Sequence, residues 1–239
     1  MKIKQKNTID MTHGTLWNKL LIFALPLAAS SILQQLFNSV DTAVVGRFAS
    51  SRALAAVGSN SSLIALMINL FIGISLGSNV IISRYIGQKA EEHVKGAIHT
   101  AIVVALCSGI FVLVLGQFIA RPVLTLMGTP KDVLDLAVLY LRIYFLGMPF
   151  IMLYDFSSSI LRSIGDSRRP LYALIAAGII NTGLNLILVI VFHLGVSGVA
   201  IATVVSNIVS SGILFYILLH EQEPVSYTHL RAHETLSDL

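Results

Sequence analysis

Residues 170–220 read PLYALIAAGIINTGLNLILVIVFHLGVSGVAIATVVSNIVSSGILFYILLH, a stretch of 51 residues without Asp, Glu, Lys or Arg. A single helix of that length would extend about 75 Å, whereas the hydrocarbon core of a bilayer is only about 30 Å thick. The stretch therefore predicts two membrane spans rather than one. We expect the turn between them at His193, Gly195, Ser197 and Gly198, which interrupt the apolar run.

The rest of the chain has the same character. Of the 239 residues, 55% are hydrophobic and 12% are charged, about half the charged fraction of an ordinary soluble domain. Other uncharged stretches, each longer than the roughly 18 residues that indicate a membrane helix, cover residues 20–40, 53–83 and 96–120. These patterns exclude an ordinary soluble enzyme and a lone signal peptide. They predict an all-α membrane protein whose six transmembrane helices cover residues 17–45, 53–83, 96–120, 131–159, 170–193 and 196–220.

The basic residues indicate how these spans are oriented. With six spans, ten Lys and Arg residues fall on the side of the N-terminus and four on the opposite side. Because positive charge accumulates in cytoplasmic loops, we expect both termini to be cytoplasmic and the protein to lie in the cell membrane. The net charge of +4 therefore reports orientation in a lipid bilayer and does not indicate a nucleic-acid partner.

Polar side chains form a stripe along the first span. Gln34, Asn38 and Asp41 fall within about 60° of one another on a helix, and Ser30 or Ser31 extends the stripe by one turn. Such groups can be the polar contacts that hold membrane helices together. Several in line that end in a carboxylate favour a water-accessible functional face.

Two later spans carry similar polar faces. Asn181 and Asn185 are one turn apart on the fifth span, and Thr203, Ser206, Asn207 and Ser210 share a face of the sixth. A carboxylate near amide and hydroxyl oxygens suits a small cation, or a carboxyl group that binds a proton. The spacing alone leaves open whether the three helices meet, and hydrogen bonding between helices explains these residues equally well.

Four other features inside the spans have plainer interpretations. Asp135 and Arg142 are seven residues apart and face the same way, so we expect them to form an ion pair. Asp155 should lie near the cytoplasmic end, in solvent or paired with a loop arginine. We interpret Gly73 and Gly77 as a close helix-packing motif. Pro26 and Pro149 can kink their spans.

Signatures of enzymes and metal sites are missing from the sequence. It has no phosphate-binding G-x-x-x-x-G-K-[ST], no H-E-x-x-H and no C-x-x-C. The single cysteine, Cys107, permits no internal disulfide and is interpreted as a packing residue. We therefore expect a protein that is not an enzyme, with no catalytic residues and no cofactor.

Five segments together resemble one transporter family. The segments are FNSVDTAVVGRF with ALAAVGSNSS after it, GISLGSNVIISRYIGQK, LRSIGDSRRP, and GIINTGLNLILVIVFHLGVSGVAIATVVSN. In this order they resemble the multidrug and toxic compound extrusion (MATE) transporters over about residues 15–219. The resemblance implies one lobe, the N-terminal one, of a twelve-helix antiporter that exports cationic or amphipathic drugs in exchange for protons or sodium.

The resemblance also implies a site. Its cation or proton ligands would be Asp41, Asn181, Asn185 and Thr203, and Gln34, Asn38, Ser206 and Asn207 would line the substrate cavity. Many relatives have an aspartate where this chain has Asn185. That difference leaves Asp41 as the only candidate acid in the cavity, so we expect Asp41 to bind a proton, with Na⁺ at Asp41 as the alternative.

Two alternatives for the function remain at this stage. A lipid-linked oligosaccharide flippase or polysaccharide exporter of the same superfamily would share the architecture, and a basic cavity would favour it. A non-transporting six-span fragment is the other. Arg142 is the only arginine expected inside a span, and the candidate cavity is acidic, which favours the drug exporter.

The two ends of the chain differ from the lobe between them. We expect a cytoplasmic N-terminus over residues 1–16, the six-span lobe over 17–220, and a polar tail over 221–239. The string SYTHLRAHET in the tail resembles translated sequencing-adapter read-through, so the tail is expected to be artefactual. The partner of the lobe would then be a missing C-terminal lobe, and less readily a second copy in a homodimer.

Overall fold

Each long apolar stretch of the sequence forms a helix in the computed structural model, which describes residues 16–221 except the side chains of Leu16, Asn18, Lys19 and Glu221. The expected tail, apart from Glu221, and nearly all of the expected N-terminal segment lie outside the described residues. In chain order the elements are α1 (Leu16–Phe48), α2 (Ser51–Gly87), α3 (Glu91–Leu126), α4 (Lys131–Leu146), α5 (Met148–Ser163), α6 (Arg168–Leu186), the π-helix η1 (Ile187–Val191) and α7 (Gly195–Glu221).

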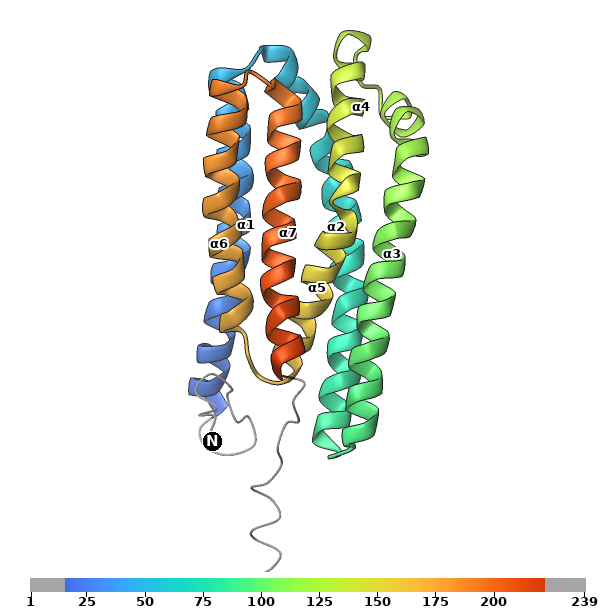
Figure 1. The fold of residues 1–239 in the computed structure, drawn as a ribbon, viewed down its shortest axis with the longest axis vertical. Coiled ribbons are helices and arrows are strands. Elements are labelled where there is room, and N and C mark those ends of the chain that lie inside the picture. Colours follow the sequence, from blue (N-terminus) through green and yellow to red (C-terminus); the bar gives the residue numbers. More distant parts are fainter. Residues whose placement is uncertain (1–15, 222–239) are drawn as a thin grey trace, which may run out of the picture.

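The helices run roughly parallel to one long axis (Figure 1). Within the described residues, five spans are long and apolar enough to cross a membrane, and α4 with α5 makes a sixth if the bent pair is one span. The six expected spans agree with this architecture. Most helices extend several residues beyond the predicted bounds, because a helix continues into the polar region past the apolar stretch.

The fourth span differs from the prediction. It was expected as one helix over residues 131–159, but it consists of α4 and α5, which meet at an angle of 49°. Pro149 lies in the first turn of α5, where a missing N–H costs nothing. It therefore begins α5 at the bend, and the kink expected in this span takes the form of a break between two helices. Here α3 passes so close that a Cβ at Gly109 would lie 2.5 Å from the Cα of Pro149.

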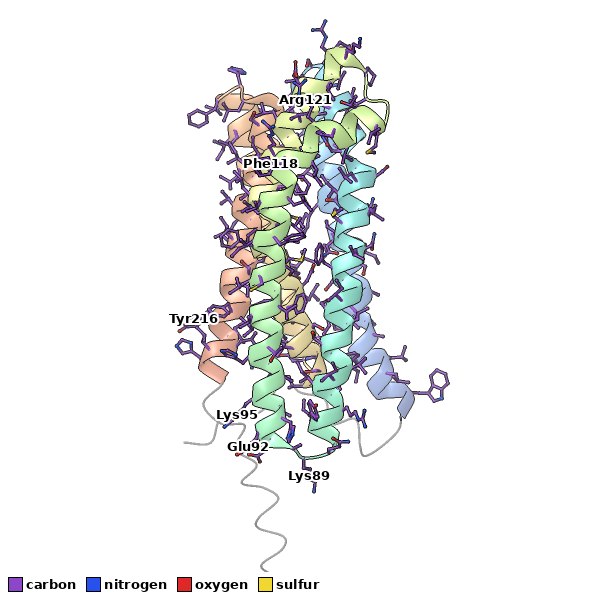
Figure 2. The ribbon with its side chains drawn as sticks, turned by 90° about the vertical axis from the view of Figure 1, so that its right-hand side faces the viewer. Lys89, Glu92, Lys95, Phe118, Arg121 and Tyr216 are labelled. Atoms are coloured by element: carbon purple, nitrogen blue, oxygen red, sulfur yellow. The ribbon has the colours of Figure 1, made fainter. Side chains whose placement is uncertain are left out.

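The connections alternate between the two ends of the bundle. Those between α2 and α3 and between α5 and α6 lie at the end where α1 begins. Those from α1 to α2, from α3 to α4 and from η1 to α7 lie at the opposite end, and α4 meets α5 partway along the bundle (Figure 1). Charged side chains follow the same division: Lys89, Glu92 and Lys95 lie at one end and Arg121 at the other (Figure 2). Apolar side chains cover the length between the ends.

Helix α5 forms the centre of the core. It packs against α2, α3 and α7, and most of its side chains are buried, including those of Met152, Phe156 and Leu161. The outer helices carry large exposed apolar residues such as Phe118 (Figure 2). An apolar exterior over a partly polar interior is the arrangement that a lipid solvent favours.

Two expectations about packing are wrong. Asp135 pairs with Arg121 of α3, not with Arg142, because seven residues along a helix separate two side chains by about 10 Å while α3 continues to Leu126 and carries Arg121 beside α4. Gly73 and Gly77 are exposed, and a Cβ at either position would contact nothing within 4 Å in the lobe. Their motif therefore mediates no close packing within the described residues.

Candidate functional site

Close packing of α1 against α6 positions the candidate site. A Cβ at Gly178 would lie 1.8 Å from Cζ of Phe37, so only a glycine leaves room for this aromatic ring. Phe37 lies one turn before Asp41 on α1, and Gly178 lies two turns before Asn185 on α6. The contact brings the polar face of α1 against that of α6.

Four polar side chains from three helices form one hydrogen-bonded chain. Nδ2 of Asn185 donates to Oδ1 of Asp41 at 2.5 Å and to Oδ1 of Asn181 at 3.2 Å. Nδ2 of Asn181 in turn lies 3.5 Å from Oγ1 of Thr203. The structure thus brings together Asp41 of α1, both asparagines of α6 and Thr203 of α7, which the spacing of the polar residues had left open.

The chain of hydrogen bonds is largely buried. Asn185 is fully buried and Asn181 is 5% exposed, while Asp41 and Thr203 are half-buried. The Thr203 hydroxyl also lies beside the Asp41 carboxyl and donates to the Val199 carbonyl at 3.0 Å. In a low-dielectric interior a hydrogen bond to a charged group is stronger than in water, so the amide of Asn185 stabilises Asp41 in its ionised form.

The other four predicted site residues lie outside this chain of hydrogen bonds. Ser206 and Asn207 are next to it on α7, but both side chains donate to the backbone carbonyl of Thr203, at 2.9 and 2.8 Å. Gln34 and Asn38 are exposed on α1. These two therefore form an open polar surface beside the buried group.

Two further structural features belong to the site, and the sequence reasoning missed the first of them. The π-helix η1 begins two residues after Asn185, and such wide turns occur often at functional sites. Tyr140 and Tyr144 of α4 are buried and stacked, with ring centroids 6.2 Å apart, and both lie within the field of Asp41. Tyr140 and Tyr144 are one helical turn apart, and this spacing indicates that their rings lie on the same face of α4. No residue pattern in the sequence predicts η1.

The site has one spare acceptor. Both N–H groups of the Asn185 amide are used, but its Oδ1 is buried without a hydrogen-bond partner in the protein. Turning the amide by half a revolution would place Oδ1 against Asp41, where it could accept a hydrogen bond from a protonated carboxyl group. Asn185 is thus able to bond to Asp41 in either protonation state.

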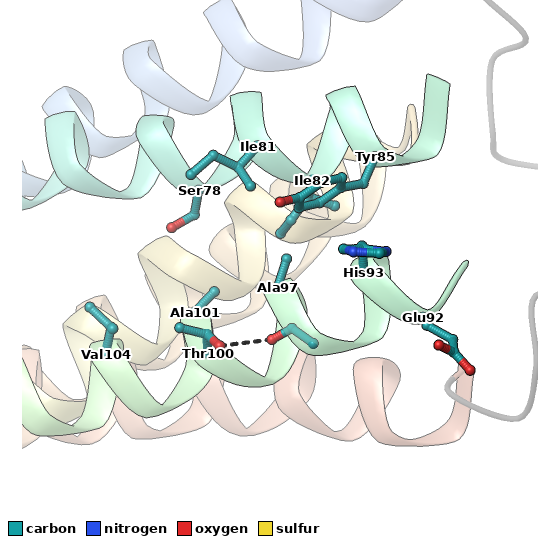
Figure 3. A pocket seen from close by; sticks show the side chains of 11 residues that line it. Ser78, Ile81, Ile82, Tyr85, Glu92, His93, Ala97, Thr100, Ala101 and Val104 are labelled. Atoms are coloured by element: carbon teal, nitrogen blue, oxygen red, sulfur yellow. Dashed lines mark hydrogen bonds between the residues drawn. The ribbon is translucent and has the colours of Figure 1, made fainter. Parts of the chain in front are cut away.

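A pocket lies elsewhere in the lobe. It has a volume of about 500 Å³ and lies between α2 and α3, with Ser78, Ile82 and Tyr85 on one side and His93 and Thr100 on the other (Figure 3). The rings of Tyr85 and His93, which both line this pocket, are 5.3 Å apart. None of the eight predicted site residues lines this pocket.

Comparison with known proteins identifies the family. The family model described as MatE matches residues 26–187, which include Asp41, Asn181 and Asn185. The chain belongs to the MATE family. The six-span lobe, with α1, α6 and α7 around Asp41, is therefore a MATE lobe, and the protein is a multi-pass membrane protein.

Relatives and solved structures agree with this assignment. The chain is 35% identical to the probable multidrug resistance protein YoeA of Bacillus subtilis over 92% of its own length, and 26% identical to the multidrug export protein MepA of Staphylococcus saprophyticus over 90%. A crystal structure of a MATE protein in a bent conformation superimposes on 88% of the chain with a TM-score of 0.82 at 25% identity.

The matches cover only part of the related proteins. The chain spans 48% of the length of both YoeA and MepA and 47% of the MATE chain in the bent conformation. It thus spans about half the length of the MATE proteins that it resembles.

Proposed function

We propose that this chain is one lobe of a secondary active efflux transporter, an antiporter that exports cationic or amphipathic drugs in exchange for protons or sodium. The names of the relatives support a multidrug substrate range. The single observation that carries the proposal is the buried contact between Asp41 of α1 and Asn185 of α6. A carboxyl group placed inside a membrane bundle is costly and is usually retained for transport or ion binding.

Proton binding at Asp41 would change the contact between α1 and α6. The ionised carboxylate accepts a charge-assisted hydrogen bond from Asn185, which is stronger than a bond between neutral groups. A proton on Asp41 removes that charge and makes the amide of Asn185 turn or release. Since α1 contacts α6 and α7, the loss alters how tightly α1 is held.

Coupling to the drug follows from competition for the same charge. A cationic substrate on the exposed face of Gln34 and Asn38 is attracted by ionised Asp41 and loses that attraction when Asp41 is protonated. Proton and drug then weaken each other's binding equally, because coupling between two sites is reciprocal. We infer that a proton is the ion that this site uses, since Asn185 replaces the second carboxylate that would favour sodium.

A second lobe completes the proposed transporter. Gln34 and Asn38 are exposed within this lobe, and we propose that they line a central cavity whose other wall is the missing C-terminal lobe. Two lobes related by an axis along the membrane normal can rock to give alternating access. A homodimer of this chain, with both copies in the same orientation, could also supply the second wall.

The proposed orientation places both chain ends in the cytoplasm and the protein in the cell membrane. Six basic residues lie at the end where α1 begins. They are Arg84, Lys89 and Lys95 near the α2–α3 connection, and Arg162, Arg168 and Arg169 near the α5–α6 connection. Positive charge at this end supports the cytoplasmic assignment. Asp41 then lies in the outer half of α1.

Drug accumulation tests the function. Bacteria that lack their own efflux pumps would express the protein from its complete reading frame, and ethidium fluorescence would be followed with and without an agent that collapses the proton gradient. We expect low accumulation that rises when the gradient is collapsed, irrespective of sodium. Equal accumulation with and without the protein would refute the proposal, and dependence on sodium alone would refute the choice of ion.

The native locus tests the role of the second lobe. Sequencing beyond the codon for His220 should show a second block of six apolar spans in frame. A stop codon there would contradict the missing-lobe proposal. Crosslinking in membranes would then decide between a homodimer and an isolated lobe.

A further inference from the structure

A second carboxyl group lies inside the lobe, on the helix that forms its core. Asp155 is in the middle of α5, and its Oδ2 is buried with no hydrogen-bond partner in the protein. The sequence had predicted a solvated side chain or one paired with a loop arginine, and that expectation is wrong. Burying an ionised carboxylate without a partner is unfavourable in free energy. The protein therefore needs some other group or molecule to stabilise Asp155, or a proton to neutralise it.

Further polar atoms continue from Asp155 along the same face of α5. Ser158 and Arg162 follow at intervals of three and four residues and therefore share its face. Nε of Arg162 and, just beyond the end of α5, Oγ of Ser167 are also buried without hydrogen-bond partners. Oγ of Ser158 is buried as well and lies beside the Tyr154 hydroxyl without forming a hydrogen bond of good geometry. Buried polar atoms that lack a protein partner are commonly satisfied by internal water.

The charged surroundings of Asp155 are simple. Arg162, two turns away and not in direct salt-bridge contact, is the charged group that acts on it, and the hydroxyls of Tyr144 and Tyr154 lie in its field. Polar groups of α2 bond to Ser159 of α5 and not to Asp155. Nδ2 of Asn79 donates to the Ser159 carbonyl at 2.8 Å, and the Ser159 hydroxyl donates to the Ser75 carbonyl at 2.5 Å.

Tyr144 lies near both acidic residues, Asp41 and Asp155. It is buried on α4, stacks on Tyr140, and lies in the field of both Asp41 and Asp155. Asp41 lies in the second half of α1, and α5, which carries Asp155, runs toward the end of the bundle where α1 begins (Figure 1). The polar interior thus extends from the Asn185 contact to the α5–α6 connection, with the tyrosines between.

We propose that Asp155 is a second proton-exchanging carboxyl group of the lobe, and that Ser158, Arg162 and Ser167 line a hydrated route for its proton to the α5–α6 connection. This inference rests on the proposed function, in which protons drive export. In the release step the O–H bond of Asp155 breaks and the proton forms a bond to a neighbouring water. Arg162 stays charged throughout; it stabilises the carboxylate that remains and orients the water, so it is a positioning residue.

Infrared spectroscopy of the purified protein in liposomes tests the proposal without any substrate. Protonated carboxyl groups absorb apart from the amide bands, and acidification should produce two such bands from inside the lobe. Asp155→Asn should remove one and Asp41→Asn the other. Asp135→Asn is the matched control, because Asp135 is 80% exposed and paired with Arg121, and it should leave both bands in place.

A second variant distinguishes a misfolded protein from a wrong assignment of the band. If Asp155→Asn does not fold, Asp155→Glu serves as the test. Because this variant keeps a carboxyl group at a slightly different position, its band should shift and not disappear. Unchanged bands in either variant would overturn the proposal, and this includes the case of a permanently ionised Asp155. Absence of ethidium export by a wild-type protein that shows both bands would refute the proposed function but not proton exchange at Asp155, because the bands do not depend on transport.

The route itself has a kinetic test. After a rapid rise in pH, the Asp155 band should decay at least about tenfold more slowly in Ser158→Ala and in Arg162→Gln than in the wild type, a change typical of impaired proton transfer. Ser211→Ala is the control, as its hydroxyl bonds to the Ile208 carbonyl of its own helix. Equal decay rates in all variants would exclude this route.

Discussion

Nδ2 of Asn185 lies 2.5 Å from Oδ1 of Asp41, across 144 residues of sequence. The contact joins the second half of α1 to the end of α6 next to η1. Because both N–H groups of the amide are used while its oxygen is not, the contact fits an ionised carboxylate and can be reversed for a protonated one. Its properties motivate the first two predictions.

Removing the charge of Asp41 should abolish coupled export. In Asp41→Asn the side chain no longer attracts a cationic drug and no longer exchanges a proton. Ethidium accumulation should rise to the level of cells without the protein at equal expression. Asp135→Asn, which removes an exposed carboxylate, should export like the wild type. Export by Asp41→Asn at the wild-type rate would show that Asp41 does not carry the coupling.

Restoring a second carboxylate should change the coupling ion. Asn185→Asp would place two negative charges side by side, which bind a small cation more tightly than one. We expect export by this variant to become stimulated by sodium, measured as drug efflux from liposomes under a sodium gradient. Asn185→Leu, which removes the donor, should weaken export with either ion. An Asn185→Asp variant that ignores sodium would contradict this account of the site.

A methyl group at Gly178 should destabilise the lobe. The Cβ of Gly178→Ala would clash with the ring of Phe37, and overpacking of this kind costs about 1–3 kcal/mol. Gly183→Ala is the matched control on the same helix, since nothing lies within 4 Å of its added Cβ, and it should be neutral or slightly stabilising. Thermal unfolding in detergent measures both, and Phe37→Leu should partly rescue Gly178→Ala.

A single asparagine ties α2 to α4. Asn60 is fully buried, and its Nδ2 donates to the Ala137 carbonyl at 3.0 Å as well as to its own helix. Asn60→Leu should lower the stability by about 1–2 kcal/mol, since it removes a hydrogen bond between membrane helices. Asn69→Leu, where the exposed amide bonds only within α2, should cost much less. Equal unfolding temperatures for the two variants would contradict this.

Most of the architecture was predictable from the local sequence. Hydropathy located the spans to within a few residues at most ends, because the exclusion of charge from hydrocarbon acts on each stretch independently. The break in the fourth span was not predictable in this way. It depends on Pro149 starting a helix where α3 approaches at Gly109, a contact between residues far apart in the sequence.

The candidate site was only partly predictable. The periodicity of Gln34, Asn38 and Asp41 marked a polar face of α1, and the family resemblance selected Asn181, Asn185 and Thr203 as its partners. Nothing in the sequence separated the buried, bonded residues from Gln34 and Asn38, which are exposed. Asp155 was misjudged for the same reason, because burial depends on which neighbours pack against each side of a helix.

The sequence by itself determined that the chain crosses a membrane several times, where the spans lie and which polar residues share a helix face, since these follow from hydrophobicity and a period of 3.6 residues. The tertiary structure decided which faces meet. Phe37 fits against Gly178 and turns Asp41 toward Asn185, while the packing of α5 among α2, α3 and α7 leaves an oxygen of Asp155 without a partner. Helix rotation and close approach are set by contacts between distant residues, and no local pattern contains them.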